Sequence, residues 1–277
     1  MKRLVLIVLL LGLGQSPISV ADQNLIFGVY TSDKASTMYK TFKPVIDALE
    51  QSLTESLQQP VRISLKIYKS YDEGLQAIIT GDADFMRMGA ASYVLAKQQN
   101  NAIQLLAMEL RKGKKTFKGE IITAFDSPIE RLDQLKGKRF AFGNKNSTIG
   151  RYFAQAALVD AGIHSQDLSA SEYLNRHDKV AYAVSLKDFD AGSVKDKTFK
   201  KFAAKQQVKA IYSFDVATKP WLASSLLDPS LATELSRALL QLKDPAVLKI
   251  LKVDGFASAT DADYDSVRNA MDRAKFF

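Results

Sequence analysis

Residues 61–88 read VRISLKIYKSYDEGLQAIITGDADFMRM, and this stretch decides the fold class. The first eight residues, Val61–Tyr68, alternate between apolar and polar side chains, which predicts a half-buried strand. Ser70-Tyr-Asp-Glu73 has the pattern of a capping box, so we expect a helix to begin there and to end at Gly81. Residues 83–88 predict the next strand. A strand, a helix and a second strand in this order are typical of an α/β unit with parallel strands.

The same alternation of strands and helices extends along the whole chain. Leu25–Tyr30 predicts a buried strand, and Phe42–Leu57 has apolar residues at helical spacing. A second α/β unit begins near residue 119. The other expected strands cover 103–108, 120–125, 138–142, 189–194 and 208–212. The other expected helices follow Gly89 or begin at Ser127-Pro128, Arg151, Asp178 and Asp228-Pro229.

This succession predicts two Rossmann-like α/β lobes joined by a hinge, each with a mostly parallel sheet and helices on both faces. We assign residues 22–112 and 215–277 to lobe I and residues 113–214 to lobe II, with the lysine-rich segment Arg111–Lys118 at the boundary. Ligands of open parallel sheets bind at the carboxyl ends of the strands, and pockets favour domain interfaces. The pattern therefore predicts a cleft binder or a cleft enzyme, without choosing between them.

The N-terminal segment has the three parts of a secretory signal peptide. Basic residues in Met1-Lys2-Arg3 precede the apolar run Leu4–Leu13, and a small-residue stretch ends at Ala21. The apolar run is shorter than the roughly 20 residues that cross a bilayer. An uncleaved N-terminal anchor is the alternative interpretation. Cleavage after Ala21 would leave 256 residues, which we expect to form a soluble periplasmic protein.

The chain contains no cysteine and only two histidines, His164 and His177. A lipid anchor on an N-terminal cysteine is therefore excluded, as are disulfides and zinc–thiolate sites. A histidine-rich metal site is also not expected, and the sequence predicts no cofactor.

The protein is basic, with a formal net charge of +8 that becomes +6 without Lys2 and Arg3. Its lysines are spread along the chain, and no basic helix is interleaved with aromatic residues, so we expect no nucleic-acid partner. The positive charge is either a solvated basic surface or a field that steers anions toward a cleft.

The loop from Gly143 to Gly150 reads GNKNSTIG and lies between a predicted strand and a predicted helix. Successive N–H groups at a helix start, with the hydroxyls of Ser147 and Thr148 beside them, suit a tetrahedral anion. The alternative is that Ser147 is only a helix N-cap. Neither a G-x-G-x-x-G motif nor a Walker A motif occurs, so a nucleotide fingerprint is absent from the sequence.

Several stretches together resemble the phosphate/phosphite/phosphonate-binding proteins of ABC importers, a family with the type II periplasmic-binding fold. Their order and spacing agree over roughly residues 25–250. The matching stretches are Phe27-Gly-Val-Tyr30, Phe42-Lys-Pro-Val, Ser70-Tyr-Asp-Glu-Gly-Leu-Gln-Ala-Ile, Gly81-Asp-Ala-Asp-Phe, Gly89-Ala-Ala-Ser-Tyr-Val-Leu-Ala, Leu135-Lys-Gly-Lys-Arg-Phe-Ala-Phe-Gly, Asn146-Ser-Thr-x-Gly150, His177 before Val180-Ala-x-Ala-Val184, and Phe189-Asp-Ala-Gly.

The resemblance implies roles for particular residues. The side chains of Ser147, Thr148, Tyr71 and His177 would contact the phosphoryl group, together with the backbone N–H groups of Ile149 and Gly150. Tyr30 and Ser92 lie in matching stretches and join the expected ligand-binding set. Taken singly, Tyr30 and Tyr71 are also compatible with packing, and His177 with a helix cap.

This chain departs from the family pattern in ways that bear on the ligand. Met88 after Arg87 replaces an aromatic residue, and Ile149 removes one hydroxyl donor. Members that bind aminoalkyl phosphonates have carboxylates for the ammonium group, but the corresponding regions here contain Lys197 and Lys219. Lysine repels an ammonium group, so we expect no preference for an amino-phosphonate. The added cations suit a doubly anionic ligand.

The resemblance favours a monomeric binding protein that captures a small oxyanion for a membrane permease. A sensory protein that signals to a membrane kinase or cyclase is the alternative. A bilobal enzyme is a third hypothesis, but Ser147 has only His177 as a conceivable base, and no orienting third residue is evident. We therefore expect no catalytic activity. A structural or adhesive role would require no cleft closure.

Overall fold

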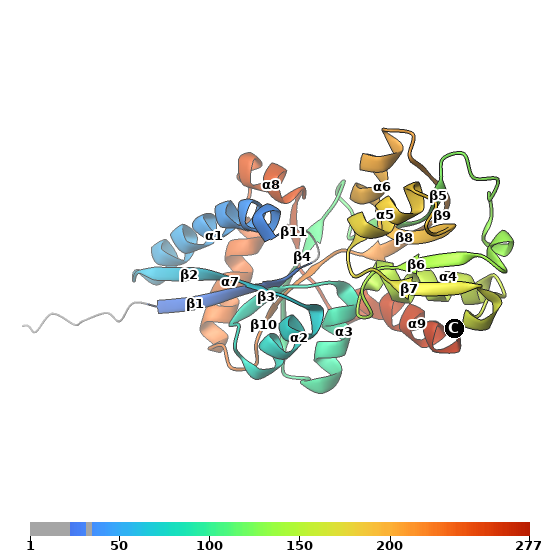
Figure 1. Cartoon of the computed structure of the whole chain (residues 1–277). Helices are drawn as coiled ribbons and strands as arrows, with labels where there is room; N and C mark the ends of the chain where they lie inside the picture. Colours follow the sequence, from blue (N-terminus) through green and yellow to red (C-terminus); the bar gives the residue numbers. More distant parts are fainter. Residues whose placement is uncertain (1–22, 32–34) are drawn as a thin grey trace, which may run out of the picture.

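The computed structural model describes residues 23–31 and 35–277, so the predicted signal peptide lies outside the described residues. Figure 1 shows two lobes side by side, each built around its own sheet. Within these ranges, no helix has both the length and the apolar character needed to cross a bilayer.

The first lobe contains a six-stranded sheet in the order β11-β4-β10-β3-β1-β2. Its strands are β1 (Gln23–Tyr30), β2 (Val61–Tyr68), β3 (Phe85–Arg87), β4 (Gln104–Leu110), β10 (Pro220–Ala223) and β11 (Gly255–Ala257). Strands β1 to β4 run parallel, as the alternating pattern predicts. The two late strands β10 and β11 run antiparallel to β4, so the sheet is mixed.

Helices cover both faces of this sheet. They are α1 (Ala35–Leu57), α2 (Tyr71–Thr80), α3 (Ala90–Gln99), α7 (Pro229–Gln241) and α8 (Pro245–Leu251). On one face Phe27 stacks on Trp221, with ring centroids 4.9 Å apart, while Tyr30 and Met86 belong to the core on the other face. Helix α2 is capped as predicted: the Ser70 hydroxyl accepts a hydrogen bond from the Glu73 N–H, and Gly81 ends the helix with φ of 83°.

The second lobe contains a five-stranded sheet in the order β7-β6-β8-β5-β9. Its strands are β5 (Thr116–Ala124), β6 (Arg139–Phe142), β7 (Ala170–Tyr173), β8 (Ala191–Lys195) and β9 (Val208–Ala217). Its helices are α4 (Ala154–Asp160), α5 (His177–Ser185) and α6 (Asp196–Ala203). Strand β5 runs antiparallel to both of its neighbours, so this sheet is also mixed.

The helix predicted at Ser127-Pro128 is wrong. The Ser127 hydroxyl accepts a hydrogen bond from the Ile129 N–H at 3.2 Å and so caps a short local turn. The Glu130 carboxylate pairs with Lys209 of β9 and does not complete a capping box. The first helical residues after β5 form a single 3₁₀ turn, Leu132–Leu135.

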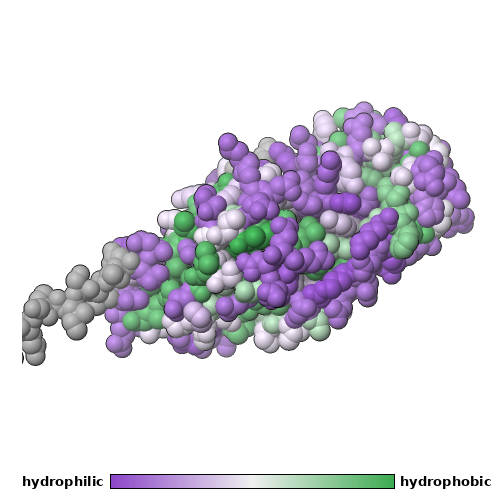
Figure 2. All heavy atoms as spheres, turned by 90° about the horizontal axis from the view of Figure 1, so that it is seen from below, coloured by the Kyte–Doolittle hydropathy of each residue, from purple (hydrophilic) through white to green (hydrophobic). Residues whose placement is uncertain are grey.

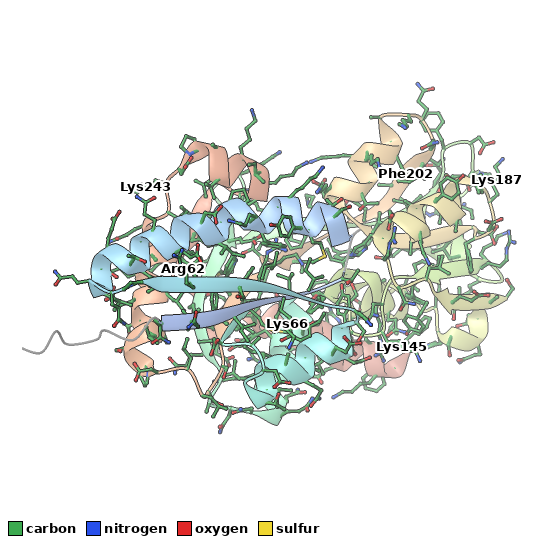
Figure 3. All side chains as sticks on the ribbon, turned by 60° about the vertical axis from the view of Figure 1, so that its left-hand side comes forward. Arg62, Lys66, Lys145, Lys187, Phe202 and Lys243 are labelled. Atoms are coloured by element: carbon green, nitrogen blue, oxygen red, sulfur yellow. The ribbon has the colours of Figure 1, made fainter. Side chains whose placement is uncertain are left out.

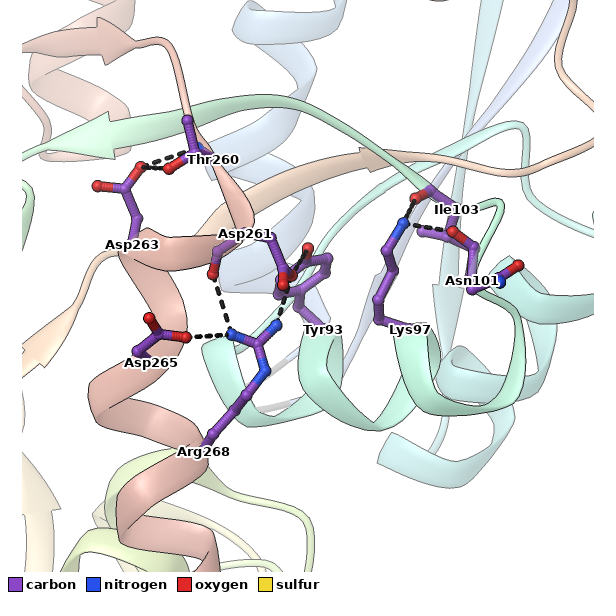
Figure 4. Close-up of polar contacts among 9 residues, drawn as sticks. All are labelled: Tyr93, Lys97, Asn101, Ile103, Thr260, Asp261, Asp263, Asp265 and Arg268. Carbon is purple, nitrogen blue, oxygen red and sulfur yellow. Dashed lines mark hydrogen bonds and ion pairs between the residues drawn. The ribbon is translucent and has the colours of Figure 1, made fainter.

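The C-terminal helix α9 (Asp265–Arg273) lies beneath the second lobe (Figure 1) and contacts both lobes. Asp261 joins it to the first lobe by accepting a hydrogen bond from the Tyr93 hydroxyl and pairing with Arg268 (Figure 4). The Phe277 carbonyl accepts a hydrogen bond from the Ser165 N–H of the second lobe at 3.0 Å. Short 3₁₀ segments complete the chain at Ser165–Asp167, Asp261–Tyr264 and Ala274–Phe276.

The chain passes between the sheets after Leu110 and again after Ala217. The assignment of residues 22–112 and 215–277 to one lobe stays a prediction, since α9 contacts both lobes. Figure 2 shows the molecule from below, with hydrophilic residues over much of this face and smaller apolar patches between them.

Candidate functional site

Two connected regions of space lie between the lobes. The inner cavity is small, about 30 Å³. Its polar lining consists of Tyr71, Ser147, Thr148, His177, Lys195 and Lys219. The rest of its lining is Gly89, Ala90, Phe117, Ile149, Val216 and Ala217. The outer cavity is much larger, about 580 Å³, and shares Phe117, Lys195 and Lys219 with the inner one.

Ser147 and Thr148 stand where the loop after β6 becomes helical. The chain first makes a π-helical turn, Thr148–Phe153, and only then continues as α4. The Ser147 carbonyl accepts hydrogen bonds from the N–H groups of Arg151 and Tyr152, at 3.1 and 3.2 Å. The first N–H groups of a helical turn have no partner within the helix, and single π-turns are frequent at functional sites. The N–H groups of Thr148 and Ile149 precede the hydrogen bonds of this turn, and their contact with a ligand stays a prediction.

Both hydroxyls of this turn accept a backbone hydrogen bond. The Ser147 oxygen accepts from the Gly150 N–H at 2.9 Å, and the Thr148 oxygen accepts from the Ala91 N–H at 2.9 Å. Because a hydroxyl carries one hydrogen of its own, each side chain keeps an O–H donor after accepting. Ser147 is therefore an N-cap, which was the alternative interpretation, and its O–H group stays available as a donor; its contact with an anion stays a prediction.

The lobes are closed over the inner cavity. The hydrogen bond from Ala91 to Thr148 crosses from the first lobe to the second. A second one crosses at the rim, where the Asn146 amide donates to the Asp72 carboxylate at 2.6 Å. A ligand held by Thr148 would therefore lie between two surfaces that move apart when the lobes open.

Gly150 allows two segments of the loop to approach closely, and its direct contact with ligand stays a prediction. Its N–H group already donates to Ser147, and Gly150 is not part of the inner cavity lining. A Cβ atom at Gly150 would lie 2.7 Å from the Gly143 Cα, and the Gly143 N–H donates to the Gly150 carbonyl at 2.7 Å. The two glycines let the loop close tightly behind Ser147.

Tyr71 and His177 approach the inner cavity from opposite lobes, as the first residues of α2 and α5. Both side chains are buried. Tyr30 and Ser92 lie behind them. The Tyr30 hydroxyl contacts the Ser92 hydroxyl at 2.9 Å and accepts a hydrogen bond from the Gly89 N–H at 2.6 Å. Neither residue lines the two cavities, so the structure gives them a supporting position, and their direct contact with ligand stays a prediction.

The lysines divide between the cavities. Lys197 lines only the outer cavity, whereas Lys219 and Lys195 line both. The pKa of Lys219 is lowered to about 7, mainly because the ammonium group is removed from water, and the charges of Arg87 and Lys195 add to this effect. Lys195 was not among the residues singled out from sequence. It ends β8, and the end of a strand cannot be placed to one residue by pattern alone.

A buried ion-pair cluster lies behind Lys219, and no local sequence pattern indicates it. The side chain of Glu109 is fully buried and accepts hydrogen bonds from Arg87, at 2.5 and 3.1 Å, and from Arg111 at 3.1 Å. Burial alone would raise the pKa of Glu109, but the attraction of the two arginines outweighs it and holds the pKa below its usual range. The carboxylate fixes both arginines at the outer cavity.

The chemistry of the inner cavity is that of an anion site. Hydroxyl, N–H, imidazole and ammonium groups line it, and none of its lining residues in the described part of the chain is a carboxylate. Across residues 23–31 and 35–277, no group of three His, Asp or Glu side chains is arranged to hold a metal ion. The geometry therefore offers several donors to one small anion.

Comparisons with known proteins agree with this geometry. A family model described as "ABC transporter, phosphonate, periplasmic substrate-binding protein" matches residues 27–264. The phosphate-import protein PhnD of Mycolicibacterium smegmatis is 25% identical, over 87% of this chain and 83% of that protein.

Two solved structures have similar folds. PhnD1 of Prochlorococcus marinus in complex with methylphosphonate has a TM-score of 0.78 at 20% identity, covering 92% of this chain and 99% of that one. A binding protein component of an ABC phosphonate transporter from Pseudomonas aeruginosa has a TM-score of 0.79 at 16% identity, covering 91% and 87%. At these identities the likeness shows the fold, and it confirms the two-lobed α/β prediction. Since the family model spans most of the chain, this protein belongs to the periplasmic substrate-binding proteins of ABC phosphonate transporters.

Proposed function

We propose that this protein captures a small phosphorus oxyanion (phosphate, phosphite or a phosphonate) in the inner cavity and delivers it to the permease of an ABC importer. The observation that carries the proposal is a lining of hydroxyl, N–H, imidazole and ammonium groups with no carboxylate among its described residues, to which both lobes contribute. Closure of the lobes buries the anion among these donors, and a membrane partner recognises the closed form.

The relatives support this range of ligands. One relative is named as a phosphate-import protein, and a second protein of the same fold is seen in complex with methylphosphonate. Aminoalkyl phosphonates are excluded from the proposal, because Lys195 and Lys219 line the cavity where an ammonium group would need a carboxylate.

The protein acts without catalysis in this proposal. The Ser147 oxygen accepts a hydrogen bond from the Gly150 N–H, as an N-cap and anion donor would. The family of transport proteins fits the same interpretation. We further propose that the chain is cleaved after Ala21 and works as a freely diffusing periplasmic monomer.

Titration calorimetry of the mature protein with phosphate, phosphite and methylphosphonate tests the proposal. We expect at least one to bind, and we expect Ser147→Ala to weaken its binding by about tenfold or more, as when a hydrogen bond to a charged ligand is lost. Ser169→Ala, at an exposed serine outside both cavities, is the matched control. The proposal fails if none of the three anions binds. If Ser147→Ala behaves like Ser169→Ala, the loop is not the binding site.

A further inference from the structure

The outer cavity is too large and too strongly charged to be only an entrance for a small anion. Its volume of about 580 Å³ lies in the range of sites that enclose whole organic ligands. Among the described residues, ten basic side chains line it, against three acidic ones. Met38, Phe42 and Phe117 add apolar surface.

The acidic side chains of the outer cavity are already engaged. Asp215 pairs with Lys118 at 3.4 Å, and Asp196 pairs with Lys200 at 2.7 Å. Asp254 accepts a hydrogen bond from the Gly113 N–H at 2.9 Å. Lys195 and Lys197 make further interactions, and Lys219 is only partly protonated near pH 7. The other seven basic side chains still exceed the three aspartates and the buried Glu109 by three charges. An excess of positive charge in one concave site attracts anions.

Two of the cations are held in fixed positions, as in a binding site. Arg87 lies over the Phe42 ring at 5.3 Å, and Arg111 lies over the Phe117 ring at 5.4 Å. Glu109 holds both guanidinium groups from behind. Cations that are ordered before binding lose little entropy when a ligand arrives.

The inner and outer cavities meet at Phe117, Lys195 and Lys219. A phosphoryl group in the inner cavity would therefore have its substituent directed past the two lysines. Because those lysines and the arginines beyond them repel a cation, the substituent must be neutral or negative, and the excess charge favours a negative one.

We propose that the ligand is an extended polyanion, in which one phosphoryl group occupies the inner cavity and at least one further phosphate or carboxylate group occupies the outer cavity. This inference rests on the proposed function, since it uses the same inner site for the first phosphoryl group. It adds the outer cavity as a second subsite of the same ligand.

The test compares pyrophosphate and tripolyphosphate with methylphosphonate, by calorimetry in a buffer free of divalent metal ions. The triple variant Lys112→Gln/Lys114→Gln/Lys252→Gln removes three exposed cations of the outer cavity. The matched control, Lys136→Gln/Lys205→Gln/Lys243→Gln, removes three exposed lysines that line neither cavity. Lys243 lies on the outer side of the first lobe (Figure 3). Both variants lose the same net charge.

We expect wild-type protein to bind pyrophosphate at least tenfold more tightly than methylphosphonate. The outer-cavity variant should lose about tenfold in pyrophosphate affinity and less than threefold in methylphosphonate affinity, and the control less than threefold in either. Ser147→Ala should weaken both ligands, because they share the inner site.

Other outcomes would overturn the inference. If methylphosphonate binds and pyrophosphate binds no more tightly, the ligand is a single small anion and the proposed function stands alone. The same holds if the two triple variants are equivalent, or if Ser147→Ala weakens methylphosphonate only. If none of these phosphoryl compounds binds, the proposed function and this inference are both wrong.

Discussion

Lys219 makes a quantitative prediction about stability and pH. Its pKa is lowered from 10.5 to about 7 in the folded protein. Between these two values the unfolded chain keeps the proton that the native protein has released. Stability rises with pH wherever the unfolded state binds more protons, so the free energy of unfolding should increase as the pH rises above 7.

The magnitude follows from the two pKa values. Each pH unit between them contributes at most about 1.36 kcal/mol. Since Lys219 is half-protonated at its folded pKa, the increase between pH 7 and pH 9 is roughly 2 kcal/mol. Lys219→Met replaces the ammonium with an apolar side chain of similar length and should abolish this increase.

Urea unfolding at pH 7, 8 and 9 measures the effect. The single tryptophan, Trp221, is fully buried two residues from Lys219 and reports unfolding by its fluorescence. No cysteine thiol titrates in this window, because the chain has none. Lys205→Met, at an exposed lysine, should keep the wild-type slope. A wild-type slope no steeper than that of Lys219→Met would refute the reasoning.

Two further variants test the architecture of the site. Gly150→Ala would place a Cβ atom 2.7 Å from the Gly143 Cα. We therefore expect the free energy of unfolding to fall by about 1–3 kcal/mol and methylphosphonate binding, measured by calorimetry, to be lost. Unchanged stability and affinity would contradict the close approach of the two glycines. Glu109→Gln would remove the carboxylate that holds Arg87 and Arg111, and we expect it to lower the free energy of unfolding, measured in urea, by about 3–5 kcal/mol. The control Glu55→Gln, at an exposed glutamate, should change this free energy little. Equal stability of the two variants would show that the arginines do not depend on Glu109.

Local signals in the sequence predicted local structure well. The hydroxyl of Ser70 and the left-handed conformation of Gly81 act within a few residues of the chain, and both ends of α2 lie where these residues indicate. Ser127 has the same pattern. However, Glu130 pairs with Lys209, which lies 79 residues after Glu130 in the chain, and the capping box stays incomplete. A long-range ion pair of this kind has no signature in a short window of sequence.

The candidate site also has parts that a short window of sequence predicts and parts that only the folded chain brings together. The anion loop at Ser147-Thr148 was visible because its glycines, hydroxyls and flanking strand are contiguous. The sequence could not show that the Tyr30 hydroxyl faces Ser92 and Gly89, since residues 30 and 92 meet only through the folded sheet. The outer cavity could not be predicted from the sequence for a similar reason. Arg87, Arg111 and Lys219 come from three separate segments, and they meet around Glu109 only in the folded chain.

The π-helical turn Thr148–Phe153 also decides which side of the following helix faces the core. A π-turn has hydrogen bonds between residues five apart, whereas an α-helix has them between residues four apart. The turn therefore contains one extra residue, which rotates the helix that follows by about 100°. After this shift, Ala154, Ala157 and Leu158 of α4 lie in the core of the second lobe while Ser147 remains at the inner cavity. Deletion of one residue from the turn would restore an ordinary helix and force a choice between those two faces. The length of this turn is therefore as much a part of the binding site as its side chains.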